Sequence, residues 1–355
     1  MNIKAQIKRS WQIVRNYRAL WVLGIAFSLL TTSTAMAFWK SIANLFMPQM
    51  MSMVPMEETE RMIQAYQHLF ESIAYSKYMD TLVAGICVFS VVIILWSIFS
   101  IILKYIFEAS LIFVVDNYES GDAKVSARQG FRLGWSKTAL RLVLIDLAIF
   151  LPLGILYLII MIIAMFNSSA MTLKYLGEGT PPVMSQYFGL QILIVIFTII
   201  STLMWIPSRL SYRACALSGM GVFASIKQGF RLTFQQIRET LTTAMSVLVI
   251  NAGLILLVGG LYFLPSYLMR IVFGTDQNMS WLIDILEGRI DPSALVVPVI
   301  IYLTITLVLY FIPFKIAEGV VLSTSSSIWT LAYKDMVSKE NQTLDSEPEE
   351  MLPSG

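Results

Sequence analysis

The sequence predicts an all-α integral membrane protein with six transmembrane helices, arranged as three parallel helical-hairpin repeats that each begin with a basic amphipathic interfacial helix. The 355 residues are 57% hydrophobic and only 14% charged, whereas a soluble domain carries about 25% charged residues. Several apolar runs reach the roughly 20 residues that a helix needs to cross a bilayer. The segment Gln-Gly-Phe-Arg-Leu occurs at 129–133 and again at 228–232, and an internal repeat of this kind determines the architecture.

A looser third copy of this segment opens the chain. Aligned without gaps, residues 5–13, 125–133 and 224–232 share a basic residue (Lys8, Arg128, Lys227), a small residue (Ser10, Gly130, Gly229) and an aromatic residue (Trp11, Phe131, Phe230). Each copy precedes a long apolar stretch. We therefore expect hairpin repeats over 1–118, 119–216 and 217–335, followed by an acidic, disordered cytoplasmic tail over 336–355.

The apolar runs predict spans over 20–39, 82–103, 142–166, 190–206, 244–264 and 295–312. Most of the Lys and Arg residues lie at the two ends of the chain and in the segments after the second and fourth spans. The opposite side holds only Lys40, Arg61, Lys77, Lys174, Arg270 and Arg289. The positive-inside rule therefore predicts that both termini are cytoplasmic. Each hairpin then leaves the cytoplasm and returns to it, so the three copies are parallel.

A cleavable signal sequence is the alternative interpretation of the N-terminal segment. Basic residues and an apolar run precede Ala35-Met36-Ala37, which fits a small-residue cleavage site. The basic leader also matches the two internal copies, which no peptidase would remove. We therefore expect the leader to be retained.

The segment that opens each repeat has an apolar face with basic flanks. In the third copy this face consists of Phe223, Ile226, Phe230, Phe234 and Ile237, which recur at steps of three and four. Such a helix lies in the membrane interface with its rings in lipid and its cations at the headgroups. We expect contacts with anionic lipid headgroups from Lys8, Arg128, Arg132, Lys227 and Arg231. The alternative is a generic connector that only orients the next hairpin. The small residue beside the aromatic would let the helix pack closely against a span.

Ionisable residues also occur inside the predicted spans or at their cytoplasmic ends, where they are costly and face a partner or water. One hypothesis is a charged vestibule that takes up a polar or anionic ligand, as in a transporter or channel. The other hypothesis is that these side chains pair with one another. The residues of this polar intramembrane cluster are Lys104, Glu108, Asp146, Arg209, Arg213, Lys315 and Glu318.

The outer loop of the first repeat is dense in methionine, and clustered thioethers can bind Cu(I). The candidate ligands are Met50, Met51, Met53 and Met56. The alternative is a flexible apolar lid, for which methionine is a usual filler.

Catalysis, a cofactor and a nucleic-acid partner are not predicted. His68 is the only histidine, so neither a Ser-His-Asp nor a Cys-His arrangement is expected. The sequence also contains neither a G-x-x-x-x-G-K-[ST] phosphate loop nor an HExxH motif.

Two stretches resemble a known family. Residues 218–234 (Ser-Gly-Met-Gly-Val-Phe-Ala-Ser-Ile-Lys-Gln-Gly-Phe-Arg-Leu-Thr-Phe) and 327–335 (Ser-Ile-Trp-Thr-Leu-Ala-Tyr-Lys-Asp) look like prokaryotic multi-pass proteins related to the membrane domain of glycerophosphodiester phosphodiesterases. The resemblance implies helix hairpins with cytoplasmic amphipathic segments in the plasma (inner) membrane. The phosphodiesterase catalytic domain has no counterpart here, so its activity is not implied.

We therefore expect a non-enzymatic accessory or scaffold protein for transport or envelope maintenance, with other membrane proteins as candidate partners. A transporter or channel is the first alternative, and copper binding through the methionine loop is the second.

Overall fold

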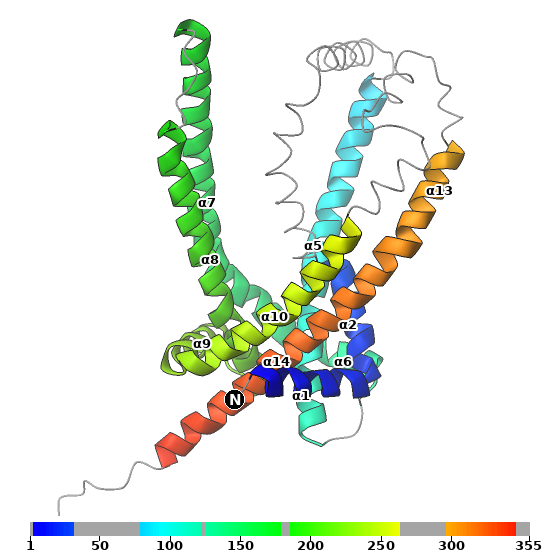
Figure 1. Cartoon of the computed structure of the whole chain (residues 1–355), viewed down its shortest axis with the longest axis vertical. Coiled ribbons are helices and arrows are strands. Elements are labelled where there is room, and N and C mark those ends of the chain that lie inside the picture. Colours follow the sequence, from blue (N-terminus) through cyan, green and yellow to red (C-terminus); the bar gives the residue numbers. More distant parts are fainter. Residues whose placement is uncertain (1–2, 32–78, 122–124, 179–184, 263–295, 346–355) are drawn as a thin grey trace, which may run out of the picture. The chain divides into compact units, whose positions relative to one another are not determined.

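The computed structural model describes residues 3–31, 79–121, 125–178, 185–262 and 296–345 (Figure 1). Every regular element within these ranges is a helix, which confirms the all-α prediction. Five helices are long and apolar enough to cross a membrane, or six if the bent pair at the N-terminus counts as one span. The described part of the chain is therefore compatible with a multi-pass membrane protein.

The long helices extend beyond the predicted spans, because hydropathy marks only the apolar part of a helix. The tail predicted from 336 onward also begins too early, since residues 336–345 are helical and 346–355 lie outside the described ranges. The long helices are α5 (Met79–Glu119), α7 (Lys137–Glu178), α8 (Ser185–Ser218), α10 (Ile237–Tyr262), and α13 (Val296–Thr306), which continues through the π-helix η2 (Leu307–Phe311) into α14 (Ile312–Asp345).

A short helix precedes a more apolar helix at three places in the chain. The short helices are α1 (Ile3–Asn16), α6 (Ala127–Gly134) and α9 (Val222–Gln235), and α1 meets α2 (Arg18–Leu30) at 98°. The breaks after α1 and α9 are alike. The N–H of Tyr17 donates to the carbonyl of Ile13, and the N–H of Gln236 donates to that of Leu232, both at 3.0 Å. Tyr17 and Gln236 occupy the same position in the ungapped alignment of 5–13 with 224–232.

The chain divides into two compact units, each of which is described by itself. The first consists of Met1–Leu20, Tyr105–Val247 and Thr324–Gly355, and the second of Trp21–Lys104 and Leu248–Ser323. The first unit therefore contains all three short helices. Its core includes buried residues of α5, α7 and α8, among them Ile112, Leu142 and Cys215.

The short helices bury small and polar residues and expose their aromatic rings. Phe223 is 82% exposed, Phe234 67%, Trp135 61% and Trp11 44%. Phe223 and Phe234 of the face predicted for the third copy are therefore outside the protein core, whereas Ile226 packs against it. One buried position is shared by all three helices in the alignment (Ser10, Gly130 and Gly229), and three further positions are buried in two of them: Gln6 with Ser225, Ile13 with Leu232, and Val14 with Gly134.

Glycines pack closely on another helix at two crossings in the first unit, of which the one at Gly229 was predicted and the one at Gly134 was not. A Cβ built on Gly134 would overlap Ser110 Oγ and the carbonyl oxygen of Ile106 on α5. A Cβ built on Gly229 would overlap Ser211 Oγ on α8. In both cases backbone therefore lies against backbone, as helix pairs in membranes often do.

The second unit contains a crossing of the same kind. A Cβ built on Gly24 of α2 would overlap Ser323 Oγ and the carbonyl oxygen of Gly319, both on α14. The same contact between helices thus occurs three times. In each case a glycine lies against the hydroxyl of a serine on the partner helix and against the carbonyl oxygen of the residue four positions before that serine.

Candidate functional site

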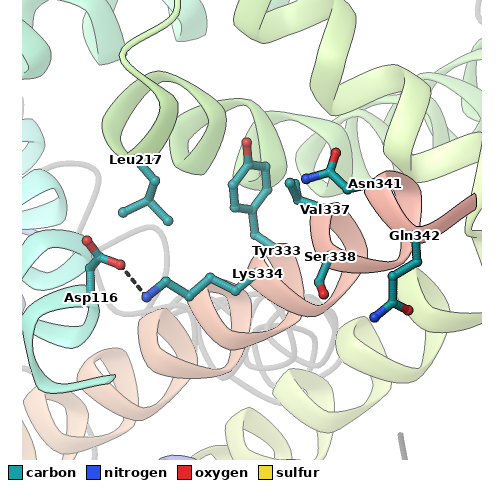
Figure 2. Close-up of a pocket in the computed structure, with 8 residues that line it drawn as sticks. All are labelled: Asp116, Leu217, Tyr333, Lys334, Val337, Ser338, Asn341 and Gln342. Atoms are coloured by element: carbon teal, nitrogen blue, oxygen red, sulfur yellow. Dashed lines mark ion pairs between the residues drawn. The ribbon is translucent and has the colours of Figure 1, made fainter. Parts of the chain in front are cut away.

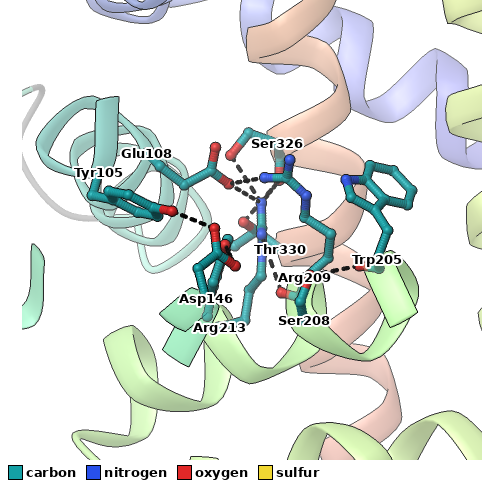
Figure 3. Close-up of polar contacts among 10 residues, drawn as sticks. Tyr105, Glu108, Asp146, Trp205, Ser208, Arg209, Arg213, Ser326 and Thr330 are labelled. Atoms are coloured by element: carbon teal, nitrogen blue, oxygen red, sulfur yellow. Dashed lines mark hydrogen bonds and ion pairs between the residues drawn. The ribbon is translucent and has the colours of Figure 1, made fainter. Parts of the chain in front are cut away.

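A buried acidic side chain in α5 pairs with two arginines of α8. Glu108 Oε1 lies 3.1 Å from Arg209 Nη1 and 3.1 Å from Arg213 Nη2 (Figure 3). The side chain of Arg213 is fully buried, and that of Glu108 is 5% exposed. Arg209 and Arg213 are four residues apart, so both project from one face of α8.

The fully buried Arg213 also bonds to α14 and to its own helix. Its Nη2 donates to Ser326 Oγ at 3.1 Å, and its Nη1 donates to the carbonyl of Arg209 at 3.1 Å. This side chain therefore joins three helices of the first unit, namely α5, α8 and α14. Because one guanidinium carries five donors in a fixed fork, arginine suits such a joint better than lysine.

Arg209 lies among aromatic rings. Its guanidinium carbon is 5.1 Å from the ring centroid of Trp205 and 5.5 Å from that of Tyr212. Trp205 in turn meets Trp329 of α14 edge to face, with 5.7 Å between the ring centroids. Cation–π contacts of this kind stabilise a charge that burial would otherwise disfavour.

Asp146 of α7 accepts hydrogen bonds from two tyrosines. The hydroxyl of Tyr105 donates to one carboxylate oxygen (Figure 3), and that of Tyr212 donates to the other. Tyr212 also lies under Arg209, so Asp146 and the Glu108 pairs form one connected network. Two carboxylates and two guanidinium groups balance each other in charge, which lowers the cost of placing them in a spanning helix.

Three buried N–H donors near this network have no acceptor among the described residues. They are Arg209 Nε, Arg213 Nε and Trp329 Nε1. A buried donor without an acceptor costs free energy. Water or a small ligand with acceptor atoms would satisfy these groups, whereas a cation would not.

A second charged pair lies in the second unit. Lys315 Nζ is 2.8 Å from Glu318 Oε2 and donates to the carbonyls of Ser28 at 2.5 Å and of Thr31 at 3.2 Å. Lys315 is 8% exposed and Glu318 is 4% exposed. The ammonium thus satisfies the last carbonyls of α2, which have no partner within their own helix.

The seven residues of the predicted cluster therefore fall into more than one group. Glu108, Asp146, Arg209 and Arg213 belong to the network of the first unit, and Lys315 pairs with Glu318 in the second. Lys104 is half-buried and also belongs to the second unit. The five residues predicted to contact lipid headgroups are all exposed: Lys8, Arg128, Arg132, Lys227 and Arg231.

The tyrosines of the network and Ser326 were not predicted from the sequence. Tyr105 lies three residues before Glu108, and Tyr212 lies three residues after Arg209. A search for hydroxyl groups on the same helical face as the predicted charges would have found both.

A cavity of 480 Å³ opens beside α14 (Figure 2). An ion pair between Lys334 and Asp116 lies at its edge, and the hydroxyls of Ser218 and Tyr333 are 2.9 Å apart nearby. Asp116 and Lys334 are thus engaged with each other, and Tyr333 is engaged with Ser218. The lining residues are Asp116, Leu217, Tyr333, Lys334, Val337, Ser338, Asn341 and Gln342.

The described ranges contain no group of three His, Cys, Asp or Glu residues that could hold a metal ion. The methionine-rich loop, including Met50, Met51, Met53 and Met56, lies outside the described residues, as does His68. Copper binding is therefore a prediction from the sequence alone.

Comparisons with family models, with curated proteins and with solved structures found no match to this chain. The resemblance to the membrane domain of glycerophosphodiester phosphodiesterases thus stays a prediction from the residues of the two stretches quoted above.

Proposed function

We propose that the protein is a non-enzymatic scaffold or accessory component of a prokaryotic plasma membrane, acting in transport or envelope maintenance. In this proposal three parallel hairpin repeats cross the bilayer, both termini are cytoplasmic, and the short helices lie on the cytoplasmic face. Other membrane proteins are its partners.

The similarity of the three short helices supports the repeat. The position of Ser10, Gly130 and Gly229 is buried in all three helices, and three other positions are buried in two of them. The breaks after α1 and α9 also fall at equivalent positions, Tyr17 and Gln236. Coincidence of buried positions and of helix ends is expected when one supersecondary unit is used several times.

The observation that carries the scaffold proposal is the internal pairing of Glu108 with Arg209 and Arg213. A site for a charged ligand needs charged side chains that have no oppositely charged partner in the protein until the ligand binds. Here each carboxylate of the network already has two partners from other helices, and Arg213 is completely buried. Such a network fixes which helices meet, a role that buried polar groups fill in some proteins.

The apolar surface of α5 supports a role in assembly. Its most apolar stretch has no buried residue, and Val88, Val92 and Trp96 are more than half exposed. In a membrane this surface contacts lipid or another apolar helix, and contiguous apolar surface often marks an interaction site.

Photo-cross-linking in native membranes tests the scaffold proposal. We would place p-benzoylphenylalanine at Val88, Val92 and Trp96 of α5, and at Leu248 and Leu256 of α10 as exposed controls. A scaffold predicts a discrete protein adduct at positions of α5 but not at the α10 controls, and the identified partner should cross-link back to the same positions. Lipid adducts alone at the three α5 positions would contradict the proposal.

A transporter or channel is the second candidate, because donors of Arg209, Arg213 and Trp329 have no acceptor in the described part of the chain and the Arg209 side chain is 22% exposed. Chloride and phosphate flux into proteoliposomes tests it. A transporter predicts protein-dependent flux that Asp146→Asn changes at unchanged folding. Equal flux in both proteins would remove this candidate.

A further inference from the structure

The three short helices differ in the acidic groups that neutralise their basic faces. On α9, both carboxylate oxygens of Glu340 are engaged. Oε1 lies 2.5 Å from Arg231 Nη2, and Oε2 accepts from Gln228 Nε2 at 3.1 Å. Glu340 belongs to α14, the last helix of the same predicted repeat. The Gln-Gly-Phe-Arg segment thus holds a carboxylate.

The equivalent face of α1 is neutralised in a similar way. Arg9, which occupies the position of Gln228 in the alignment, forms an ion pair with Glu119. Glu119 is the last residue of α5, which closes the first predicted repeat. In both cases, then, an acidic residue of the helix that closes the repeat, just beyond the predicted last residue of that repeat, contacts the short helix that opens it.

Within the described residues, no such carboxylate contacts the basic face of α6. Gln129 is used locally, since its Oε1 accepts from the N–H of Ser126 at 2.8 Å in a capping box. Arg128 and Arg132 are exposed, and neither has a hydrogen bond or ion pair to any residue in the described ranges. The helix that closes the second repeat, α8, contains no Asp or Glu between Ser185 and Ser218.

We propose that α6 binds the headgroup phosphate of an anionic phospholipid through Arg128 and Arg132, of which Arg132 occupies the position of Arg231, the partner of Glu340 on α9. The inference rests on the equivalence of these helices proposed above, but not on the scaffold function. Arg128 and Arg132 are four residues apart and therefore share one face. Guanidinium groups match phosphate oxygens in geometry.

The apolar neighbours of this pair favour a lipid over free phosphate. Leu133 is 44% exposed and Trp135 is 61% exposed. The ring of Trp135 lies 5.8 Å from that of Phe131, which in turn lies 5.2 Å from that of Phe107 on α5. An exposed aromatic and aliphatic surface beside two cations is the pattern by which a helix settles at the boundary between headgroups and acyl chains.

Native mass spectrometry tests the proposal on the full-length protein in detergent, titrated with dioleoylphosphatidylglycerol or dioleoylphosphatidylcholine. Two well-placed cations contribute roughly a tenfold or larger preference for anionic lipid. Arg128→Gln/Arg132→Gln should therefore weaken one phosphatidylglycerol site about tenfold. The matched control is Lys227→Gln/Arg231→Gln on α9, which should weaken binding by a smaller factor, because Glu340 already pairs with Arg231 and only Lys227 is left to contact the lipid.

A gain-of-binding variant keeps the proposal testable if the double variant folds poorly. Glu340→Gln removes the internal carboxylate and should create one additional phosphatidylglycerol site on α9. Inorganic phosphate at millimolar concentration should not displace the lipid, which separates a lipid site from a free-anion site.

Three results would overturn the proposal: unchanged phosphatidylglycerol binding in Arg128→Gln/Arg132→Gln, equal losses in the α6 and α9 double variants, or displacement of the lipid by phosphate. None of them affects the cross-linking test of the scaffold function, so the two proposals fail separately.

Discussion

Replacing Gly229 by alanine tests the contact between α9 and α8. The new Cβ would overlap Ser211 Oγ and lie 2.7 Å from both the carbonyl oxygen of Pro207 and the amide nitrogen of Ser211. The serine side chain can rotate away, but the two backbone atoms belong to α8, so the helices must separate. Overpacking of this kind costs about 1–3 kcal/mol, and alanine recovers up to about 1 kcal/mol through its higher helix propensity. We expect a net loss of roughly 1–2 kcal/mol.

Unfolding by sodium dodecyl sulfate in mixed micelles, followed by circular dichroism, measures this loss. The control is Gly253→Ala in α10, where an added Cβ meets no atom within 4 Å, so stability should be unchanged or slightly higher. In the double variant Gly229→Ala/Ser211→Ala the Oγ contact is gone and the backbone contacts remain, so recovery should be partial at most. If Gly229→Ala is as stable as Gly253→Ala, the close approach does not exist and the reasoning is refuted.

Further predictions concern the buried charges, and the same unfolding measurement checks each of them. Glu108→Gln leaves two buried guanidinium groups without their carboxylate and should cost about 3–5 kcal/mol, whereas Glu108→Leu combined with Arg213→Met removes a complete ion pair and should cost less. Asp146→Asn keeps one acceptor oxygen for the two tyrosines and should cost about 1–3 kcal/mol. Lys315→Met leaves Glu318 buried without a cation and should cost about 3–5 kcal/mol. Values within about 0.5 kcal/mol of the wild type, as for ordinary surface substitutions, would show that these groups are not buried and paired.

The sequence predicted the helical class and the regions of the apolar helices, because long apolar runs leave few alternatives. It also predicted that a small residue beside the aromatic of each short helix would allow close packing, as Gly229 does against α8. These features depend on local composition and spacing, which one sequence contains in full.

Helix ends were predicted less well. Hydropathy falls after Leu103, but α5 continues to Glu119, because a helix outside the lipid needs only suitable propensity and packing. The same reason explains why residues 336–345, which are polar and acidic, are helical and not disordered: Met336 is 1% exposed, and Glu340 pairs with Arg231.

Periodicity could not predict that the charged residues of the spans form separate groups in the two units. Glu108 and Lys315 each lie a few residues after the end of a predicted span, yet Glu108 faces α8 and Lys315 faces the end of α2. Which helix lies opposite a residue is a property of the tertiary arrangement. For the same reason, the hydroxyls of Tyr105 and Tyr212 were not recognised as partners of Asp146.

The account depends most on the three short helices facing the same side of the membrane. Labelling of single cysteines tests this directly. The aligned basic positions Lys8, Arg128 and Lys227 are exposed and would be replaced by cysteine one at a time, in a background in which Cys87 and Cys215 are absent. A membrane-impermeant maleimide should modify all three in inside-out vesicles and none in right-side-out vesicles, whereas labelling of any one from the opposite side would contradict the account.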